Sequence, residues 1–414
     1  MRERWAVRGV SSSGQREGAR PPRLAGEPDR EREKGSRLSR DKVVSSARLP
    51  AGRDDGGVDA DLVIVGGGQA GLAVAYYARR AGLGAVVLDA DDRPGGAWQH
   101  MWDSLHLFSP ASSSAMPGWP MPVGLQDPPG RDQVVDYLTR YEQRYGFDVQ
   151  RPVRVTAVER AGPVRTGLVV RSDVGELATP VVVSATGTWR RPFWPVYPGQ
   201  ALFRGRQLHV AGYQAPTPYA GKKVLVVGGG NSGAQVMAEL APLADATWVV
   251  PREPRFLPDD VDGRALFAAA ARRRTAILRG EAVDGGVAGV GGLGDVVVVP
   301  TVRAARDAGL LRTSPPFRSF TSDGVVWLDG RTEPVDAVIW CTGFRPVLDH
   351  LRPLHVRHAG RVAVSGTRAV EVPGLWLVGY GDWTGPGSAT LAGVGPTARD
   401  TVREVVAALG RTAA

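Results

Sequence analysis

The spacing Gly-x-Gly-x-x-Gly occurs twice in this chain, at residues 66–71 and again at residues 228–233. Each copy follows a short apolar run and opens a helix-forming run. In such a unit the first glycine permits a tight turn, the second lets backbone approach a pyrophosphate, and the third lets helix and strand pack closely. The unpaired N–H groups at the start of the helix favour phosphate. We therefore expect two dinucleotide sites that depend on Gly66, Gly68, Gly71, Gly228, Gly230 and Gly233.

The residue after the second strand of each unit predicts which nucleotide binds. Asp89 ends the run GAVVLDA, where a carboxylate accepts hydrogen bonds from a ribose diol. The corresponding run of the second unit, ADATWVVPREPRF, contains no acid after the strand and offers Arg252 and Arg255, which suit a 2′-phosphate. We predict NADPH rather than NADH there; the alternative for either arginine is a plain surface residue of the small domain. Two such sites favour a flavoprotein reduced by a nicotinamide nucleotide over a dehydrogenase, which needs one.

A further glycine turn follows Asp89. Gly95, Gly96 and Trp98 place flexible backbone and one large aromatic side chain where a flat ring system could lie. We predict FAD at this first site, while noting that Trp98 taken alone is more readily explained as a core residue.

Composition limits the class of protein. The chain has 414 residues, of which 43% are hydrophobic and 22% charged, so it can form two or three globular domains. Residues 1–57 hold 14 basic and 9 acidic side chains and so contribute +5 of the net charge of +9. They lack apolar periodicity, so we expect a disordered basic tail; an arm that binds RNA or an acidic surface is the alternative. For the rest of the chain we expect no nucleic-acid partner. We expect the protein to be cytoplasmic.

Other classes are excluded by what the sequence lacks. No apolar run is long enough to cross a membrane. One cysteine and six scattered histidines predict no disulfide scaffold and no metal site.

The remaining elements are predicted from periodicity. Residues 131–146 place apolar side chains on one helical face, which indicates core packing rather than chemistry. Short runs over 151–189 indicate an antiparallel meander that returns to the parallel sheet and ends in Ala185-Thr186-Gly187. Residues 265–279 read as a helix with a solvated basic patch, residues 281–295 as a flexible surface loop, and a last helix starts near Thr397.

The run FRGRQLHVAGY precedes the second glycine turn and matches Phe-x-Gly-x-x-x-His-x-x-x-Tyr at Phe203, Gly205, His209 and Tyr213. This pattern resembles the signature of flavin-containing monooxygenases; the related Baeyer–Villiger enzymes typically end it in Trp. The resemblance covers roughly residues 59–410 and includes GGAW, ATG, CTGFRP and VGYGDWTGPGSATLAGVG. The stretches WDSLHLFSP, PGWPMP, PRFLPDDVDG and YGDWTGPGSATL are most similar to monooxygenases encoded beside arsenic-resistance genes.

The resemblance implies an α/β fold with two Rossmann-like dinucleotide-binding domains of the three-layer ββα type. The NADPH domain, residues 199–334, is then inserted in an FAD domain made of residues 58–198 and 335–414.

The resemblance also implies roles for individual residues. The first turn, Asp89, Gly95, Gly96, Trp98 and Thr186 would hold FAD, with Asp382 bonding its ribityl chain. The second turn with Ser232, Arg252 and Arg255 would hold NADPH, and Phe203, Gly205 and Tyr213 would form a hinge between the sites. Asn231, His209 and Ser109 are the candidates for catalytic contacts, although a lone histidine such as His209 is more often structural.

The implied reaction transfers one oxygen atom from O2 to a small soft nucleophile through a flavin hydroperoxide. One departure bears on it: many relatives have an asparagine beside the flavin in a segment resembling xxNSP, whereas this chain reads His106-Leu107-Phe108-Ser109-Pro110. The missing amide leaves two outcomes open at this point, in which either oxygen transfer or peroxide release dominates. The alternatives are a reductase or oxidase that passes electrons onward, a disulfide reductase, which lacks its second cysteine here, and a non-catalytic flavin-binding regulator. The substrate and a homodimeric state stay open.

Overall fold

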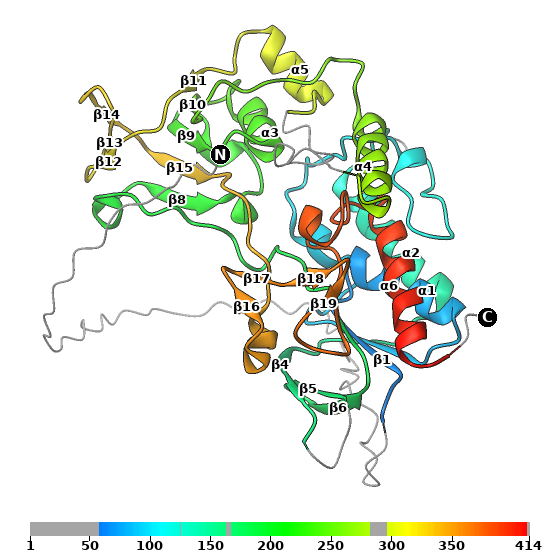
Figure 1. The fold of residues 1–414 in the computed structure, drawn as a ribbon. Helices are drawn as coiled ribbons and strands as arrows, with labels where there is room; N and C mark the ends of the chain where they lie inside the picture. The colour runs from blue at the N-terminus through cyan, green and yellow to red at the C-terminus, as the bar shows by residue number, and fades with distance from the viewer. Residues whose placement is uncertain (1–57, 125, 163–166, 282–295, 412–414) are drawn as a thin grey trace, which may run out of the picture. The chain divides into compact units, whose positions relative to one another are not determined.

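Two sheets organise the chain, each built around one of the two glycine turns (Figure 1). The computed structural model describes residues 58–124, 126–162, 167–281 and 296–411, all within one unit, Ser46–Ala414. The predicted tail, residues 1–57, and nearly all of the predicted loop 281–295 lie outside the described residues.

The first sheet has the strand order β18-β19-β20-β7-β1-β2-β3. It is parallel from β20 to β3, with β18 and β19 added antiparallel at one edge. The middle strand of its parallel part is the apolar run before the first glycine turn, and every residue of that strand is buried. The strands are β1 (Leu62–Val65), β2 (Ala85–Leu88), β3 (Val149–Gln150), β7 (Val182–Ser184), β18 (Val364–Ser365), β19 (Arg368–Ala369) and β20 (Leu375–Leu377).

The second sheet is parallel throughout, in the order β11-β10-β9-β15-β8. The helix α3 (Asn231–Leu240), which opens at the second glycine turn, lies against it in Figure 1, with α5 (Pro300–Asp307) packed on α3. The strands are β8 (Arg206–His209), β9 (Lys223–Val227), β10 (Asp245–Val249), β11 (Thr313–Ser314) and β15 (Ala337–Trp340).

Three smaller sheets complete the strand set. The predicted meander is confirmed as the antiparallel sheet of β4 (Val155–Arg160), β5 (Leu168–Ser172) and β6 (Gly175–Thr179), which leads into β7. The others are β12 (Ser319–Phe320), β13 (Gly324–Val326) and β14 (Thr332–Pro334), and the pair β16 (Arg357–His358) and β17 (Arg361–Val362).

The other helices are α1 (Gln69–Arg80), α2 (Arg131–Tyr145), α4 (Gly263–Leu278) and α6 (Val394–Ala408). The predicted core stripe of α2 is confirmed, since Val134, Tyr137, Leu138 and Tyr141 are buried. The last helix starts at Val394 rather than near Thr397. Pro396 lies in its first turn, where a proline costs no intrahelical hydrogen bond, so the helix can begin before it.

The segment 101–110 leaves the first glycine unit and packs into the core of the second. Trp102 is 3% exposed within the cluster that contains the buried side chains of β9, β15 and α3, and Leu105 and Phe108 pack on the same cluster. The segment therefore follows the first glycine unit in the sequence but packs against the second unit in space. It connects the two candidate nucleotide sites.

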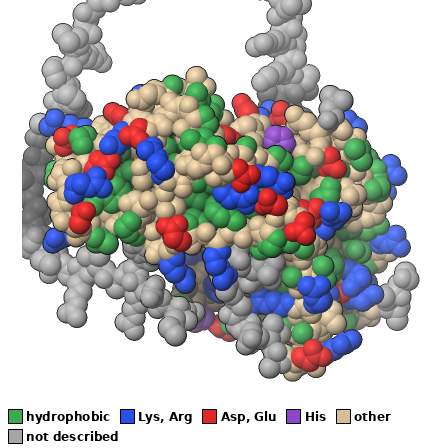
Figure 2. All heavy atoms as spheres, turned by 90° about the horizontal axis from the view of Figure 1, so that it is seen from above, with side chains coloured by type: hydrophobic (Ala, Val, Ile, Leu, Met, Phe, Trp, Pro, Cys, Tyr) green, Lys and Arg blue, Asp and Glu red, His purple; other side chains and the backbone are tan. Residues whose placement is uncertain are grey.

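The described surface carries mixed charge. On the face seen in Figure 2, Lys and Arg side chains lie interspersed with Asp and Glu. Of the helices in the described ranges, none combines the length and the apolar character needed to span a bilayer.

Candidate functional site

The first glycine turn is required by close packing. Gly66 has φ +108°, and a Cβ there would lie 2.6 Å from the carbonyl oxygen of Ala185. A Cβ on Gly71 would lie 1.8 Å from the carbonyl oxygen of Gly66. Gly68 is different: its Cβ would meet only the Cα of Gly96, at 3.7 Å. The two glycine loops thus bring bare backbone together, as a bound pyrophosphate requires.

Asp89 follows β2 and is buried beside the turn. Its Oδ2 accepts a hydrogen bond from Arg151 Nε at 2.8 Å, and Arg151 Nη1 donates to Glu142 Oε1 at 2.6 Å. The side chains of Arg151, Asp89 and Glu142 are only 9%, 8% and 15% exposed. One carboxylate oxygen of Asp89 is thus committed to Arg151. Oδ1 accepts a long hydrogen bond from the Asp91 N–H at 3.5 Å and has room to accept another from a ligand. Arg151 and Glu142 have no motif around them and were missed by sequence reasoning.

Trp98 is held in place by the start of α1. Its Nε1 donates to Gln69 Oε1 at 2.8 Å, and Gln69 Nε2 donates to the carbonyl oxygen of Ala389 at 2.7 Å. Gln69 therefore connects the loop at Gly95 and Gly96 to the loop before α6.

Thr186 belongs to a buried polar network at the ends of β7 and β20. Its hydroxyl bonds the carbonyl oxygen of Val347 at 2.6 Å and the Tyr380 hydroxyl at 2.7 Å, and that hydroxyl bonds Ser184 at 2.6 Å. His350 Nε2 lies 3.0 Å from Ser184 Oγ. Thr186 therefore has protein partners and holds the end of β7.

Burial gives His350 a measurable signature. Desolvation lowers the pKa of this imidazole from 6.5 to about 4. The unfolded chain binds the proton at higher pH than the folded chain, so stability falls as pH drops from about 6.5 towards 4. We expect His350 to account for about 2 kcal/mol of lost unfolding free energy between about pH 7 and pH 5. Urea unfolding at both pH values measures this. Between them the His350→Gln variant should lose less unfolding free energy than the wild type, and an equal loss in the two proteins would contradict the prediction.

Asp382 lies in the loop before α6 and meets α4. Arg273 Nη1 donates to Asp382 Oδ2 at 3.1 Å, and the next residue, Arg274, pairs with Asp400 of α6. The helix α4 also approaches the segment 101–110, since the Gly263 N–H donates to the carbonyl oxygen of Phe108 at 2.8 Å. Asp382, the residue predicted to bond the ribityl chain of FAD, is therefore contacted by α4, a helix that follows the second glycine unit in the sequence.

The second glycine turn repeats the geometry of the first. Gly228 has φ +128°, and its Cβ would lie 2.2 Å from the carbonyl oxygen of Cys341; a Cβ on Gly233 would lie 2.1 Å from the carbonyl oxygen of Gly228. A Cβ on Gly230 would meet no described atom within 4 Å. Space thus lies over Gly230, at the start of α3, where a phosphate would bind.

Asn231 and Ser232 are the first residues of α3, and both are half-buried. Asn231 Oδ1 accepts a hydrogen bond from the Val297 N–H at 2.8 Å. The Asn231 side chain thereby anchors the segment at Val297 to the second turn. Within the described ranges, no group accepts a hydrogen bond from its amide N–H groups.

Arg252 and Arg255 follow β10 and are both exposed. Among the described residues, none forms a hydrogen bond or ion pair with the guanidinium of Arg252. This cation is therefore available to a ligand at the end of β10.

The motif at residues 203–213 packs at the second sheet. The Phe203 ring covers Gly205, where a Cβ would lie 2.2 Å from Phe203 Cζ. His209 Nε2 lies 3.0 Å from the carbonyl oxygen of Gly343, and its Nδ1 accepts from the Ala211 N–H at 3.2 Å. Burial lowers the pKa of His209. A neutral ring that donates from Nε2 and accepts at Nδ1 has no nitrogen left to act as a base.

His209 also holds the two chain segments that connect the sheets. Residues 187–193 and 343–347 run side by side, with hydrogen bonds from Phe193 N–H to Gly343, from Arg345 N–H to Arg191, and from Val347 N–H to Gly187. Each of these segments leads from one sheet to the other, so the motif contacts the connection itself.

Ser109 is 3% exposed, and its hydroxyl lies 2.8 Å from the Ser114 hydroxyl. A Cβ on Gly263 would lie 2.5 Å from Ser109 Cβ, so the start of α4 covers this serine. Ser109 therefore lies at a junction of the 101–110 segment and α4.

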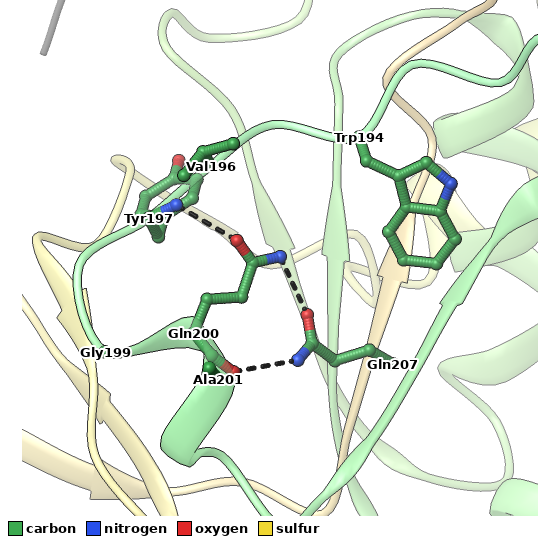
Figure 3. A pocket seen from close by; sticks show the side chains of 7 residues that line it. All are labelled: Trp194, Val196, Tyr197, Gly199, Gln200, Ala201 and Gln207. Carbon is green, nitrogen blue, oxygen red and sulfur yellow. Dashed lines mark hydrogen bonds between the residues drawn. The ribbon is translucent and has the colours of Figure 1, made fainter. Parts of the chain in front are cut away.

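A shallow hollow of about 570 Å³ lies on the connection between β7 and β8 (Figure 3). Gln200 and Gln207 bond each other across it at 3.0 Å. None of the predicted cofactor residues lines it, so it is not either nucleotide site. Its lining is Trp194, Val196, Tyr197, Gly199, Gln200, Ala201 and Gln207.

Two buried groups, one on Arg273 beside Asp382 and one on Thr397 of α6, fit a flavin. Among the described residues, Arg273 Nε and Thr397 Oγ1 have no hydrogen-bond partner. Buried donors usually have partners, and the carbonyl or hydroxyl groups of a bound cofactor would supply them. Together with the glycine loops, these residues fit FAD at the first turn, and the open space over Gly230 fits NADPH at the second.

Comparisons with known proteins agree with this geometry. A family model described as pyridine nucleotide-disulphide oxidoreductase matches residues 63–264. An uncharacterized CzcO-like oxidoreductase of Geobacillus kaustophilus is 26% identical, over 84% of this chain and 98% of its own length. The indole-3-pyruvate monooxygenase YUCCA1 of Oryza sativa subsp. japonica is 30% identical, over 76% of this chain and 83% of its own. A flavin-containing monooxygenase from Stenotrophomonas maltophilia is 47% identical with a TM-score of 0.76, over 84% of this chain and 98% of its own.

The disulphide chemistry named by the family model needs paired cysteines, and this chain has one. Cys341 is buried against the second turn, and burial raises the pKa of its thiol, so it stays protonated. The similarity to the two monooxygenases covers most of each of them. The chain belongs to the flavin-containing monooxygenase family.

Proposed function

We propose that this chain transfers one oxygen atom from O2 to a small soft nucleophile, with FAD at the first glycine turn and NADPH at the second. As a member of its family the chain is an FAD-dependent monooxygenase that uses NADPH. The observation that carries the assignment of sites is a difference between two turns of the same geometry. Asp89 follows the first unit, whereas the second is followed by Arg252, which has no ion-pair partner among the described residues.

At the first site, backbone at Gly68 and Gly96 lies against the pyrophosphate and Asp89 Oδ1 accepts from the ribose. Asp382 bonds the ribityl chain, Trp98 lies near the ring, and Thr186 holds the end of β7 beside it. The bound flavin supplies the oxidation–reduction chemistry and the activation of O2. The protein contributes orientation, donors and the exclusion of water.

At the second site, Gly228, Gly230, Ser232 and Gly233 hold the NADPH pyrophosphate, while Arg252 and Arg255 hold the 2′-phosphate. This proposal includes two Rossmann-like domains, with residues 199–334 inserted between 58–198 and 335–414. We place the enzyme in the cytoplasm, where a single cysteine stays reduced.

Asn231, Ser109 and His209 have different proposed roles. The free amide N–H groups of Asn231 donate near the reacting groups, and Ser109 contributes to the wall formed by the segment 101–110 and α4. His209, together with Phe203, Gly205 and Tyr213, acts on the connection between the sites through Gly343.

The Arg252→Ala variant tests the choice of nucleotide. A charge-assisted hydrogen bond contributes about 1.5–3 kcal/mol, so we expect NADPH affinity to fall about ten- to a hundred-fold. NADH lacks the 2′-phosphate and is the matched control, and its affinity should not change. Titration of both nucleotides measures this; an unchanged NADPH affinity would remove Arg252 from the site.

The reaction is tested on the purified yellow protein. NADPH consumption is followed with sulfides, amines, ketones and arsenicals, and peroxide and oxygenated product are measured in parallel. A substrate that raises product and lowers peroxide supports oxygen transfer. NADPH consumption matched by peroxide with every substrate would instead assign the chain as an oxidase.

A further inference from the structure

The carboxylate of Glu239 connects three parts of the protein. Glu239 lies on α3, and its Oε1 accepts hydrogen bonds from Trp102 Nε1 at 3.1 Å and from the Ser104 hydroxyl at 2.7 Å. Its Oε2 accepts from the Tyr213 hydroxyl at 2.9 Å. Three donors thus converge on one half-buried side chain.

The three donors come from segments tied to different sites. Trp102 and Ser104 belong to the segment 101–110, which leaves the first glycine loops and leads to Ser109. Tyr213 ends the motif whose His209 bonds the connection between the sheets. Glu239 itself lies two turns along the helix that begins at the second glycine turn.

The rings of Trp102 and Tyr213, which both donate to Glu239, are buried and in contact with each other. Trp102 is 3% and Tyr213 is 1% exposed, and their rings meet edge to face with centroids 6.0 Å apart. Burial and the neighbouring Glu239 raise the pKa of Tyr213, so its hydroxyl remains a donor. The segment 101–110 is therefore connected to α3 by buried packing as well as by hydrogen bonds.

A carboxylate suits this position better than an amide. It accepts at both oxygens, so it can take all three donors at once. An asparagine or glutamine amide offers a single acceptor oxygen, and its NH2 group cannot accept from Tyr213.

We propose that Glu239 is a positioning residue for the reduction of the flavin by NADPH, holding the segment 101–110 in register with the nucleotide-binding helix α3. The inference rests on the proposed function, because it assigns the two nucleotides to the two turns. Hydride transfer is sensitive to distance, and a misplacement of about 1 Å can cost a hundred-fold in rate.

The test compares Glu239→Gln with the wild type. We expect an unchanged flavin content, a limiting rate of flavin reduction about ten- to a hundred-fold lower in stopped flow, and faster amide hydrogen exchange across residues 101–110. Tyr213→Phe deletes one donor and keeps the ring. It should shift the same two measurements in the same direction, and it replaces Glu239→Gln as the test if that variant folds poorly.

Glu333→Gln is the matched control. Glu333 also accepts from a tryptophan, Trp327 Nε1 at 2.7 Å, but it lies on the separate sheet of β12, β13 and β14. It should change neither reduction rate nor exchange at 101–110. The inference is overturned if Glu239→Gln reduces its flavin at the wild-type rate, or if exchange at 101–110 is unaffected. A wild-type chain that bound no flavin would instead remove the proposed function, and the exchange measurement would still decide the role of Glu239.

Discussion

The Gly68→Ala and Gly230→Ala variants are expected to fold normally and each to lose one cofactor. Both glycines have extended backbone, with φ −79° and −95°. An alanine Cβ at Gly68 would meet only Gly96 Cα at 3.7 Å, an ordinary contact, and one at Gly230 would meet no described atom within 4 Å. The protein therefore tolerates both methyl groups, and any effect must come from a ligand lying there.

The expected losses are separable. Overpacking against a ligand costs about 1–3 kcal/mol, or about five- to a hundred-fold in affinity. Gly68→Ala should lower bound flavin, measured by absorbance per protein, and Gly230→Ala should weaken NADPH binding while the protein stays yellow. Thermal unfolding of the flavin-free proteins should match the wild type. Wild-type flavin content in Gly68→Ala would contradict the assignment of the first turn.

Neighbouring glycines supply the control. A Cβ at Gly71 or Gly233 would lie 1.8 or 2.1 Å from a backbone carbonyl oxygen. Alanine at these positions should therefore destabilise the fold itself and reduce soluble protein. The four variants together distinguish glycines needed for packing from glycines needed for the ligand.

Local signals made much of the fold predictable. The apolar run before the first glycine turn, the helix that opens at this turn and the apolar face of α2 follow from apolar periodicity and glycine position. The structure confirms them as β1, α1 and the buried face of α2. The start of α6 was wrong by three residues, because proline can occupy the first turn of a helix as well as precede it.

Long-range partners were not predictable from the sequence. Asp89 was chosen because an acid after the second strand has a known use, but nothing in the local sequence identifies Arg151, which lies 62 positions away. The same holds for Glu239 and Trp102, which are 137 positions apart. His209 was identified by its motif, whereas the commitment of both ring nitrogens is visible only once Gly343 and Ala211 are placed beside it.

The Arg151→Met variant is expected to show a large loss of unfolding free energy. Methionine keeps much of the side-chain volume but leaves Asp89 and Glu142 as buried carboxylates without a counter-charge. Breaking a buried ion pair from one side typically costs about 3–5 kcal/mol. Urea unfolding at neutral pH measures this, and the remaining folded protein should bind flavin more weakly, since Asp89 Oδ2 loses the partner that orients it.

Arg171→Met is the matched control, because Arg171 also lies between two glutamates, Glu159 and Glu176, but is 49% exposed. Exposed pairs contribute little, so its unfolding should stay close to that of the wild type. Adding Glu142→Gln to Arg151→Met removes one of the two stranded charges and should recover part of the loss. If Arg151→Met unfolded like Arg171→Met, the buried pair would hold neither the fold nor the orientation of Asp89. The Asp89 carboxylate, which we propose accepts from the ribose, would then be positioned by β2 alone.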